Sequence, residues 1–418
     1  MPTVPDTPSP DTSSPKTSSP AQRPAAAPSQ TLPILFLAVA GFASQAMVRS
    51  ADSLLPQIAS DMGVMVGVAS IIVSVYSLIH GSMQLFMGPI GDRFGKYRMT
   101  AITCGGAAVA VASCGLMHSL STLLIARIVS AAFASWIIPM GMAYVGDVVP
   151  YERRQQVLAR YLSGQISGQL FGQAAGGILG DLLGWRGVFF VLAAFLAAAA
   201  LGLLHQLMTN PITHQHADAP QPRGFIAENK VVLMNPWACF ILLVAFLEYS
   251  LMFGSFAYVS ADLHHRFGLS FTIIGLIISM FGVGGLIYSG FVGQFVARFG
   301  QVGLVSVGGA FMGLAYLALA ASGSPWQPPL ATVLLGLGFY MMHNTLQTNA
   351  TQMSPQARGT AVGLYSAALY LGQTAGVALA APFIDRHGAQ PAFVVSGIAL
   401  AALGIWIAIR LRRRQQTA

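Results

Sequence analysis

The sequence has very little charge. Asp, Glu, Lys and Arg make up only 8% of its 418 residues, whereas soluble domains carry about 25%. Apolar residues account for 55%, and apolar runs of about 20 residues, each long enough to cross a bilayer as a helix, recur along the chain. The composition therefore excludes an ordinary soluble protein and predicts an all-α polytopic membrane protein embedded in a lipid bilayer.

Cysteine is equally scarce. Cys104, Cys114 and Cys239 lie in apolar segments without the spacing of a metal or redox motif, so we expect three small buried apolar residues and neither a metal nor a cofactor. No P-loop pattern is present, and ATP is therefore not expected to be the energy source. Paired His and Asp residues at active-site spacing and a nucleophile elbow are also missing, which argues against an enzyme.

The positive net charge has a topological explanation. A charge of +8 would suggest nucleic acid as the partner of a soluble protein, but here the basic residues lie in short loops between apolar runs. When successive loops are placed on alternate sides, 16 of the 21 Lys and Arg residues fall on one side, 3 on the other and 2 within spans. By the positive-inside rule we expect both termini in the cytoplasm, and no nucleic-acid partner.

Breaks in the apolar runs predict twelve transmembrane helices. They are expected near residues 32–58, 68–90, 99–118, 121–146, 157–180, 187–207, 236–259, 271–294, 302–322, 328–349, 359–382 and 391–411. A cytoplasmic central loop, 208–235, divides them into a bundle over 32–207 and a bundle over 236–411. Residues 1–31 are too rich in Pro, Ser, Thr and Ala to bury much surface, and predict a disordered cytoplasmic tail; 412–418 form a basic cytoplasmic tail.

The two halves repeat one another. A shift of 205 residues superimposes several residues of the first half on identical residues of the second: Gly63 on Gly268, Ser74 on Ser279, Gly88 on Gly293, Pro150 on Pro355 and Arg153 on Arg358. Duplicated halves are typical of transporters whose central site opens alternately to the two sides of the membrane. We therefore predict two pseudo-symmetric six-helix bundles around a central site.

The charged segment GPIGDRFGKYR, residues 88–98, joins the second and third predicted helices. It resembles the signature that the major facilitator superfamily carries at this place, and the likeness extends over residues 31–411. The resemblance implies a monomeric transporter in which the signature gates the conformational change. The matching residues are Gly88, Gly91, Asp92, Arg93, Gly95, Lys96 and Arg98. Asp92 can cap a helix N-terminus, and the second-half copy has Ala297 in its place. The alternative is that the basic residues only set the topology.

Two further segments are similar to the drug:proton antiporters of that family. Residues 123–150 resemble the fourth-helix pattern, whose arginine, here Arg127, is implied to take part in proton coupling. An arginine inside a span costs roughly 2.5–3.5 kcal/mol on insertion scales unless it is paired or hydrated, so a partner or a cavity is expected; snorkelling to the outer interface is the alternative.

Residues 164–177 resemble the fifth-helix pattern of the same antiporters, although Gln173 stands where proline is usual. Glycines four residues apart let two helices approach closely, which suffices to explain them as helix-packing residues. The glycines that match are Gly168, Gly172, Gly176 and Gly177.

Few ionisable residues fall within the spans, and these are the candidates for proton coupling. Glu248 has no basic residue within a helical turn or two, and an unpaired carboxyl group in a low-dielectric span is suited to carry a proton. The alternative is a glutamic acid hydrogen-bonded across the bundle. Arg49 and Asp52 are three residues apart on one helix and can face each other. Asp52 is either part of a local ion pair or shared between Arg49 and Arg127 as a switch.

A polar cluster on the tenth helix supplies further cavity candidates. Histidine titrates near physiological pH, so His343 could also carry a proton; hydrogen bonds that pack the helices are the alternative. The residues expected to line a substrate cavity are Arg49, Gln84, Trp136, Gln169, Tyr249, His343, Asn344 and Gln347.

Together these patterns predict a secondary transporter of the bacterial inner membrane. It would export small organic molecules, drugs or metabolites, in exchange for protons by alternating access. The alternative is a proton symporter or facilitator that imports a small metabolite such as a sugar or a carboxylate. Arg49 and Arg127 suit an anionic substrate and Glu248 suits a cation, so the sequence leaves the charge of the substrate open.

Overall fold

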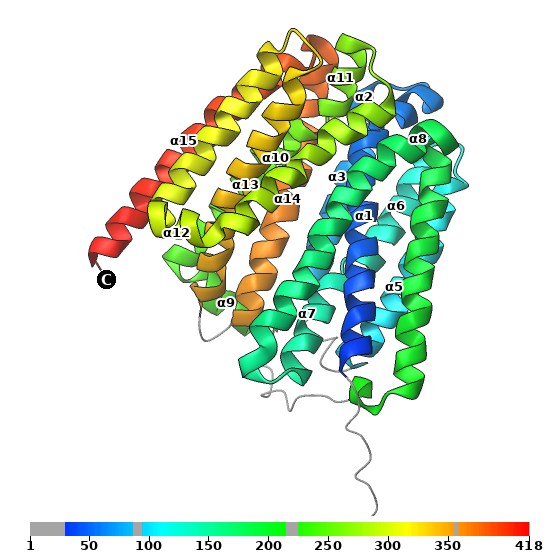
Figure 1. The fold of residues 1–418 in the computed structure, drawn as a ribbon, viewed down its shortest axis with the longest axis vertical. Helices are drawn as coiled ribbons and strands as arrows, with labels where there is room; N and C mark the ends of the chain where they lie inside the picture. The colour runs from blue at the N-terminus through cyan, green and yellow to red at the C-terminus, as the bar shows by residue number, and fades with distance from the viewer. Residues whose placement is uncertain (1–29, 87–93, 215–224, 355–357, 418) are drawn as a thin grey trace, which may run out of the picture.

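The structure, a computed structural model, describes residues 30–86, 94–214, 225–354 and 358–417 (Figure 1). These residues are helical and contain no strand. The first half comprises α1 (Thr31–Met62), α2 (Val66–Ala69), α3 (Ile71–Gln84), α5 (Lys96–Gly115), α6 (Leu120–Ala134), α7 (Ile137–Val148), α8 (Tyr151–Thr209) and the 3-10 helix η1 (Pro211–His214). The second half comprises α9 (Phe225–Leu233), α10 (Pro236–Phe256), α11 (Val259–Phe267), α12 (Phe271–Ala321), α13 (Gln327–Gln352), α14 (Arg358–His387) and α15 (Ala389–Thr417).

Eight helical segments among the described residues are long and apolar enough to cross a membrane. The prediction of an all-α polytopic membrane protein is confirmed. Two of these segments contain a sharp bend, at Gly184 within α8 and at Gly300 within α12, and each of them therefore passes through the bundle twice. The helices α5 and α13, with 20 and 26 residues, are also of spanning length. These segments are sufficient for twelve transmembrane helices, but the count of twelve stays a prediction.

The 205-residue repeat is visible in the backbone. Gly63 and Gly268 end α1 and α11 in the left-handed conformation, with φ of 65° and 62°, which glycine adopts without the steric penalty of a side chain. Every glycine with positive φ in the described part of the chain has a counterpart in the other half: Gly63 with Gly268 and Gly95 with Gly300 at the 205-residue shift, and Gly184 with Gly388 at a shift one residue shorter. The repeat therefore marks equivalent turns in the two halves.

The glycines of residues 164–177 lie against neighbouring helices. A methyl group on Gly172 would lie 2.2 Å from the carbonyl oxygen of Ala46 in α1, and one on Gly372 of α14 would lie 2.1 Å from that of Phe246 in α10. The other glycines of the motif are as crowded: Gly168 by Phe42, Gly176 by Ser53, and Gly177 by Phe271 of the opposite half. Only glycine allows two helices to approach each other this closely. The packing of α8 against α1 in the first half thus recurs as the packing of α14 against α10 in the second.

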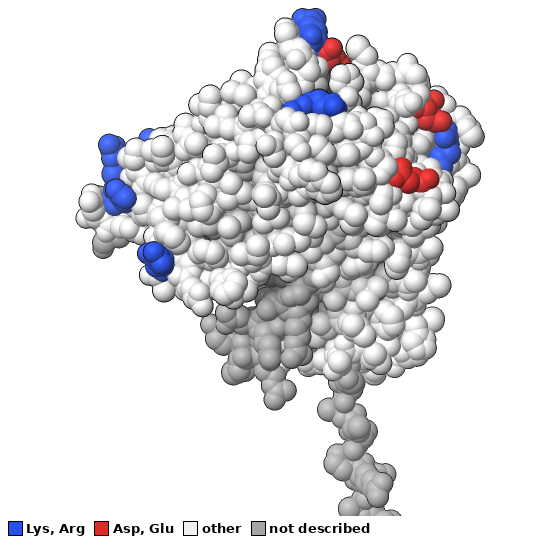
Figure 2. Space-filling view, turned by 45° about the horizontal axis from the view of Figure 1, so that its top comes forward, with Lys and Arg blue, Asp and Glu red and all other residues white. Residues whose placement is uncertain are grey.

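The surface of the bundle is apolar where it would meet lipid. Figure 2 shows Lys, Arg, Asp and Glu at the margins of a wide uncharged face. Large apolar side chains such as Val109, Ile125 and Leu182 are more than half exposed on the outer surface of the bundle. Cys104 and Cys114 are buried as predicted, but Cys239 is exposed. The prediction of burial was wrong for Cys239, because an apolar run does not show which face of its helix points outward.

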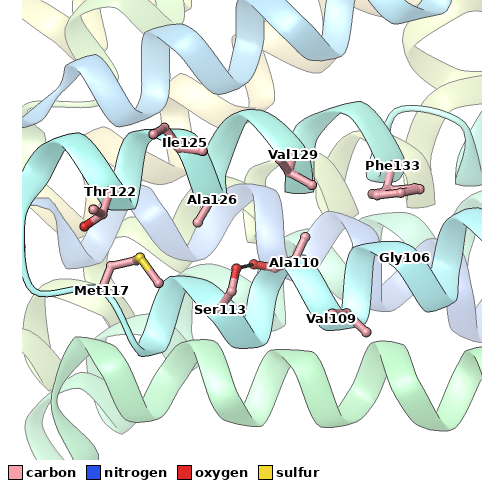
Figure 3. A pocket seen from close by; sticks show the side chains of 10 residues that line it. All are labelled: Gly106, Val109, Ala110, Ser113, Met117, Thr122, Ile125, Ala126, Val129 and Phe133. Carbon is pink, nitrogen blue, oxygen red and sulfur yellow. Dashed lines mark hydrogen bonds between the residues drawn. The ribbon is translucent and has the colours of Figure 1, made fainter.

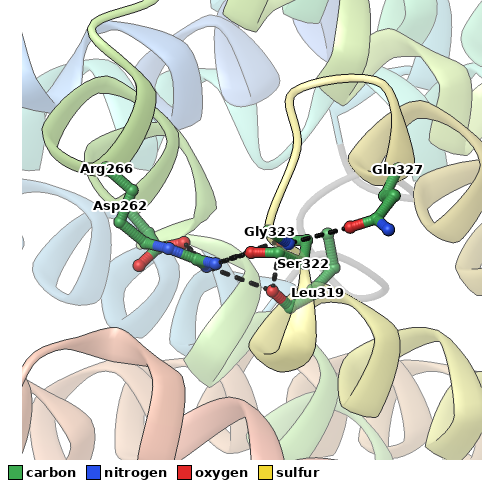
Figure 4. Close-up of polar contacts among 6 residues, drawn as sticks. All are labelled: Asp262, Arg266, Leu319, Ser322, Gly323 and Gln327. Atoms are coloured by element: carbon green, nitrogen blue, oxygen red, sulfur yellow. Dashed lines mark hydrogen bonds and ion pairs between the residues drawn. The ribbon is translucent and has the colours of Figure 1, made fainter.

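One end of the bundle, which we call the distal end, carries Asp61, Asp181, Asp262 and Asp385; α1 begins at the opposite end. In the second half, Arg266 of α11 donates to the Asp262 carboxylate at 2.9 Å and to the Leu319 carbonyl of α12 at 3.2 Å (Figure 4). Arg266 also donates to the Ser322 carbonyl. These bonds fasten α11 to the turn between α12 and α13.

The first half has an equivalent contact made by a different helix. Arg186 of α8 donates to the Asp61 carboxylate at 2.8 Å and to the Met117 carbonyl at 3.2 Å. In both halves an arginine thus joins a carboxylate at the distal end to a carbonyl at the end of another helix, and each half is held together at this end.

The two halves are joined at the distal end by a pair of related contacts. The Asp385 carboxylate of α14 accepts a 2.9 Å hydrogen bond from the Gly67 amide of α2. The Asp181 carboxylate of α8 accepts a 2.6 Å hydrogen bond from the Thr272 amide of α12. Gly67 and Thr272 are equivalent under the 205-residue shift, and each aspartate precedes a positive-φ glycine by three residues. We call Asp181 and Asp385 the carboxylate caps.

Other hydrogen bonds between the halves also lie toward this end in the described part of the chain. They run from Ser260 to the Asp52 carbonyl, from Tyr258 to Ser70, and from Thr374 to the Ser74 carbonyl. No hydrogen bond between the halves is recorded among described residues at the opposite end. The halves are therefore closed together at the distal end.

Some predicted segments lie outside the described residues. These are the N-terminal tail up to residue 29 and most of the 88–98 signature, including Gly88, Gly91, Asp92 and Arg93. The segment 208–235, predicted as a loop, contains η1 and the helix α9.

Candidate functional site

A cavity of about 250 Å³ lies between the two halves. Helices α1 and α8 form one wall, and α10, α12 and α13 form the other. Its lining residues are Gln45, Arg49, Gln165, Ile166, Gln169, Tyr249, Phe253, Tyr288, Ser289, Phe339, Tyr340, His343, Asn344 and Gln347. The structure thus brings together Arg49, Gln169, Tyr249 and the cluster on α13, which the sequence predicted separately.

Two predicted cavity residues lie elsewhere. Gln84 is the last residue of α3 and does not line the cavity. Trp136 lies at the break between α6 and α7, where it packs with Met140 and Met99. Proline at position 139 explains the break, because its ring clashes with the carbonyl four residues earlier and turns the helix at that point. The sequence did not show which face of its helix Trp136 occupies, because a tryptophan in an apolar run can lie on any face.

Glu248 of α10 is paired with His343 of α13. The Nδ1 atom of His343 lies 3.0 Å from Oε2 of Glu248, and Glu248 is fully buried. The other carboxyl oxygen, Oε1, has no hydrogen-bond partner. The expectation of an unpaired carboxyl group was wrong, because the partner lies 95 residues away in the chain. The pair can hold and release one proton, and only its histidine lines the cavity.

Arg49 and Asp52 of α1 face each other as the spacing predicted. Arg49 Nη1 lies 3.7 Å from Asp52 Oδ2, and both side chains are buried. The guanidinium stacks over the ring of Phe253, 4.0 Å from its centroid. Arg49 Nε and Nη1 and Asp52 Oδ2 make no hydrogen bond. This is a loose ion pair at the junction of the two halves, with the arginine on the cavity side.

Arg127 is buried in the first half rather than in the cavity. Its guanidinium lies 4.3 Å from the ring centroid of Tyr76 and donates from Nη1 to the sulfur of Met47 at 3.5 Å. The structure records no ion pair between the described residues Arg127 and Asp52. The sequence predicted a partner or a cavity for Arg127, and the structure gives it the face of an aromatic ring as its partner. Sharing of Asp52 between Arg49 and Arg127 stays a prediction.

Aromatic residues that sequence reasoning missed make up much of the cavity wall. Phe339 stacks on the His343 ring with centroids 4.8 Å apart, and Tyr249 lies 5.4 Å from the same ring. Asn344 donates to the Tyr288 hydroxyl at 2.8 Å. Tyr249 was predicted as a lining residue. Aromatic residues in apolar runs usually pack against other helices, so nothing in the sequence marked Phe339 and Tyr288 as lining residues.

Part of the 88–98 signature can be followed in the structure. Lys96 at the start of α5 forms a 2.7 Å ion pair with Asp147 of α7, and the chain turns at Gly95 with φ of 88°. Arg98 is exposed. The Lys96 contact fastens α5 to α7 at the end opposite the carboxylate caps.

A larger hollow of about 570 Å³ lies between α5 and α6 (Figure 3). Its lining contains no charged side chain, and it includes Val109 and Ile125, which are exposed on the outer surface. This hollow faces lipid rather than the junction of the halves. Among the residues that the structure describes, no group of three or more His, Cys, Asp or Glu side chains could hold a metal ion.

The family profile described as Major Facilitator Superfamily matches residues 37–377 and 267–418. The chain belongs to the major facilitator superfamily. It is therefore a multi-pass membrane transporter of a small-molecule substrate and not an enzyme. The resemblance seen at the 88–98 signature is confirmed at the level of the family.

Curated relatives within the superfamily are distant. An uncharacterized MFS-type transporter of Bacillus subtilis (strain 168) is 25% identical over 336 residues, which cover 78% of this chain and 83% of the relative. A chloramphenicol resistance protein of Streptomyces lividans is 24% identical over 354 residues, or 84% and 88% of the two chains. Multidrug resistance protein 2 of Bacillus subtilis (strain 168) is 24% identical over 331 residues, or 77% and 80%.

Solved structures of two other transporters share the fold of this chain. The crystal structure of the nucleoside transporter NupG has a TM-score of 0.73 at 14% identity, covering 90% of this chain and 99% of its own. The POT family transporter PepTSo has a TM-score of 0.76 at 13% identity, covering 94% and 100%. These likenesses show the major facilitator fold alone.

Proposed function

We propose that this transporter exports small organic molecules in exchange for protons. The observation that carries the proposal is the pair formed by Glu248, fully buried, and His343, whose ring lines the cavity between the halves. A proton from the cavity reaches Glu248 through His343. The names of two relatives, a chloramphenicol resistance protein and a multidrug resistance protein, support efflux as the direction.

Exchange requires that proton and substrate occupy the cavity alternately. A substrate lying against His343 and Tyr249 would cover the histidine and block the movement of a proton to or from Glu248. Release of the substrate would expose His343 again. Rocking of the two halves, the mechanism typical of duplicated transporters, would then carry the proton in one direction and the substrate in the other.

We further propose that the distal end faces the outside of the bacterial inner membrane. The basic residues of α15 that follow its apolar stretch, Arg410 and Arg412–Arg414, lie at the opposite end, together with the beginning of α1. The positive-inside rule places that end in the cytoplasm. With the halves closed at the distal end, the structure would then represent a state with access from the cytoplasm.

This orientation predicts the behaviour of fusions at the C-terminus. Green fluorescent protein fused after Ala418 should fluoresce, and alkaline phosphatase fused at the same point should be inactive, because that enzyme folds only outside the cytoplasm of a bacterium. Phosphatase fused after Gly323, in the distal turn between α12 and α13, should be active. The reverse pattern would overturn the orientation.

Removal of the buried carboxyl group should abolish proton coupling. Everted membrane vesicles are energised to acidify their interior, and a ΔpH-sensitive dye reports protons released when a compound is added. A panel of cationic, neutral and anionic compounds is tested on the unchanged chain, on Glu248→Gln and on Glu228→Gln, a matched substitution outside the candidate spans. We expect a substrate to release protons with the unchanged chain and with Glu228→Gln, and no release with Glu248→Gln.

The same experiment separates the alternative function. Arg49 in the cavity also suits the import of a carboxylate by symport. If no compound moves protons in everted vesicles while a radiolabelled carboxylate accumulates in intact cells, the export proposal is wrong and symport takes its place. If Glu248→Gln retains full proton release, the carrier role of Glu248 is wrong whatever the direction.

A further inference from the structure

The charge of the cavity is set by Arg49. Arg49 lines the cavity, whereas its partner Asp52 does not. Glu248, the residue that suggested a cationic substrate, is also absent from the lining because it is buried behind His343. No Asp or Glu is found among the described residues that line the cavity. A cation would therefore meet Arg49 without a carboxylate in contact with it.

The guanidinium of Arg49 has hydrogen-bonding capacity to spare. It is 5% exposed, and its Nε and Nη1 donate to no protein acceptor. The Asp52 carboxylate at 3.7 Å compensates the charge but does not accept these hydrogen bonds. A buried donor without an acceptor is destabilising, and a carboxylate oxygen is an acceptor that forms a strong, charge-assisted hydrogen bond with a guanidinium donor.

The cavity wall around Arg49 is aromatic. Phe253 lies under the Arg49 guanidinium, which is 4.0 Å from its ring centroid. Phe339 and Tyr249 line the cavity beside it, with the three ring centroids 4.8–5.9 Å apart and the ring planes inclined 54–75° to one another. Rings of this kind pack well against a planar apolar body. The cavity of about 250 Å³ is small, near the lower limit for ligand pockets, so that body is limited to about one aromatic ring with a short chain.

We propose that the substrate is a compact aromatic carboxylate whose anionic group is held by Arg49 and whose ring lies against Phe339 and Tyr249. The proposal rests on the proposed function only in taking this cavity as the substrate site. It resolves the conflict between basic and acidic candidates, because the structure leaves the arginine in the cavity and withdraws the glutamate into a pair with His343.

Binding of three probes with one body and different charges tests this proposal. The probes are 3-phenylpropanoate, 3-phenylpropanamide and 3-phenylpropylamine, which are anionic, neutral and cationic at pH 7. Binding to the purified full chain in detergent is measured by the shift of its thermal unfolding temperature and by isothermal titration calorimetry. We expect the carboxylate to bind at least about tenfold more tightly than the amide, since a charge-assisted hydrogen bond contributes more than a neutral one, and the amine to bind most weakly.

Variants assign the preference to Arg49. Arg49→Gln should remove the preference for the carboxylate over the amide, and Arg49→Lys should retain part of it, because lysine keeps the charge but lacks the planar pair of donors. Arg386→Gln, which removes an exposed arginine at the distal end, should leave the preference unchanged. Binding of the amide reports whether the Arg49→Gln cavity is still formed. Equal binding of the three probes, tighter binding of the amine, or a preference that survives Arg49→Gln would overturn the proposal.

The outcome is independent of proton coupling. The binding measurements use no gradient and no transport, so the carboxylate can bind through Arg49 even if the vesicle experiment excludes exchange for protons. Conversely, proton release driven by 3-phenylpropylamine in the vesicles, without binding of the carboxylate, would leave the export function standing and exclude an anionic substrate.

Discussion

Replacement of Gly172 by valine should prevent the first half from assembling. A side chain at this position would overlap the carbonyl oxygen of Ala46 in α1, 2.2 Å from the first added carbon. The obstacle is backbone, so no rotation of a neighbouring side chain can relieve it, and α1 and α8 must separate. Overpacking of a core typically costs about 1–3 kcal/mol and occasionally more; a contact with backbone belongs at the upper end of this range.

The measurement is the yield of monodisperse protein from detergent-solubilised membranes, together with its unfolding temperature. Gly372→Val should have the same effect in the second half, where the added carbon would lie 2.1 Å from the Phe246 carbonyl oxygen. Gly290→Val is the matched control: this glycine is also in a helix, but nothing lies within 4 Å of the added carbon. Normal yield and stability of Gly172→Val would show that the two helices do not approach as closely as described.

The packing of these glycines shows what the sequence could predict. Their spacing of four residues indicated a face for close helix contact, because that periodicity follows from helix geometry alone. The contacting helix, α1, could not be derived, since nothing in a glycine pattern identifies its partner. The 205-residue repeat was more informative: it predicted equivalent turns, and Gly63 and Gly268 indeed end their helices with nearly the same backbone angles.

The sequence identified several residues of the candidate site one at a time, but it did not show which of them contact one another. Glu248 was conspicuous because an acid is expensive inside an apolar span, and His343 because it interrupts one. Their contact joins helices far apart in sequence, and only the fold could show it. Phe253 and Phe339 could not be found at all, because an aromatic residue in a transmembrane run can face lipid, another helix or a cavity with the same local sequence.

The carboxylate caps were missed for a further reason: Asp181 and Asp385 come just after the predicted spans 157–180 and 359–382, where a single acidic residue has many ordinary explanations. In the structure each accepts a hydrogen bond from the backbone of the other half, and together they hold the distal end closed. These bonds must break when the cavity opens to that side. The caps therefore stabilise one of the two end states of the transport cycle, as any contact present in only one state must.

Removal of both caps should shift the transporter toward the state that is open at the distal end. A charge-assisted hydrogen bond contributes about 1.5–3 kcal/mol when it is shielded, as that of Asp385 partly is; Asp181 is exposed and contributes less. With about 1.4 kcal/mol for each factor of ten, the double variant Asp181→Ala, Asp385→Ala should raise the population open at the distal end at least about tenfold.

Labelling of a cavity cysteine measures this population. Gln169→Cys is introduced after the three native cysteines are replaced by serine, and a membrane-impermeant maleimide is added outside intact cells. We expect faster labelling in the double cap variant, an intermediate rate in each single variant, and no change in Asp262→Ala, whose carboxylate lies at the same end but bonds within one half. If the double variant is present at normal levels and is labelled no faster, the caps do not hold the distal end closed. Faster labelling in Asp262→Ala as well would mean that general loosening of this end, rather than loss of the bonds between the halves, opens the cavity.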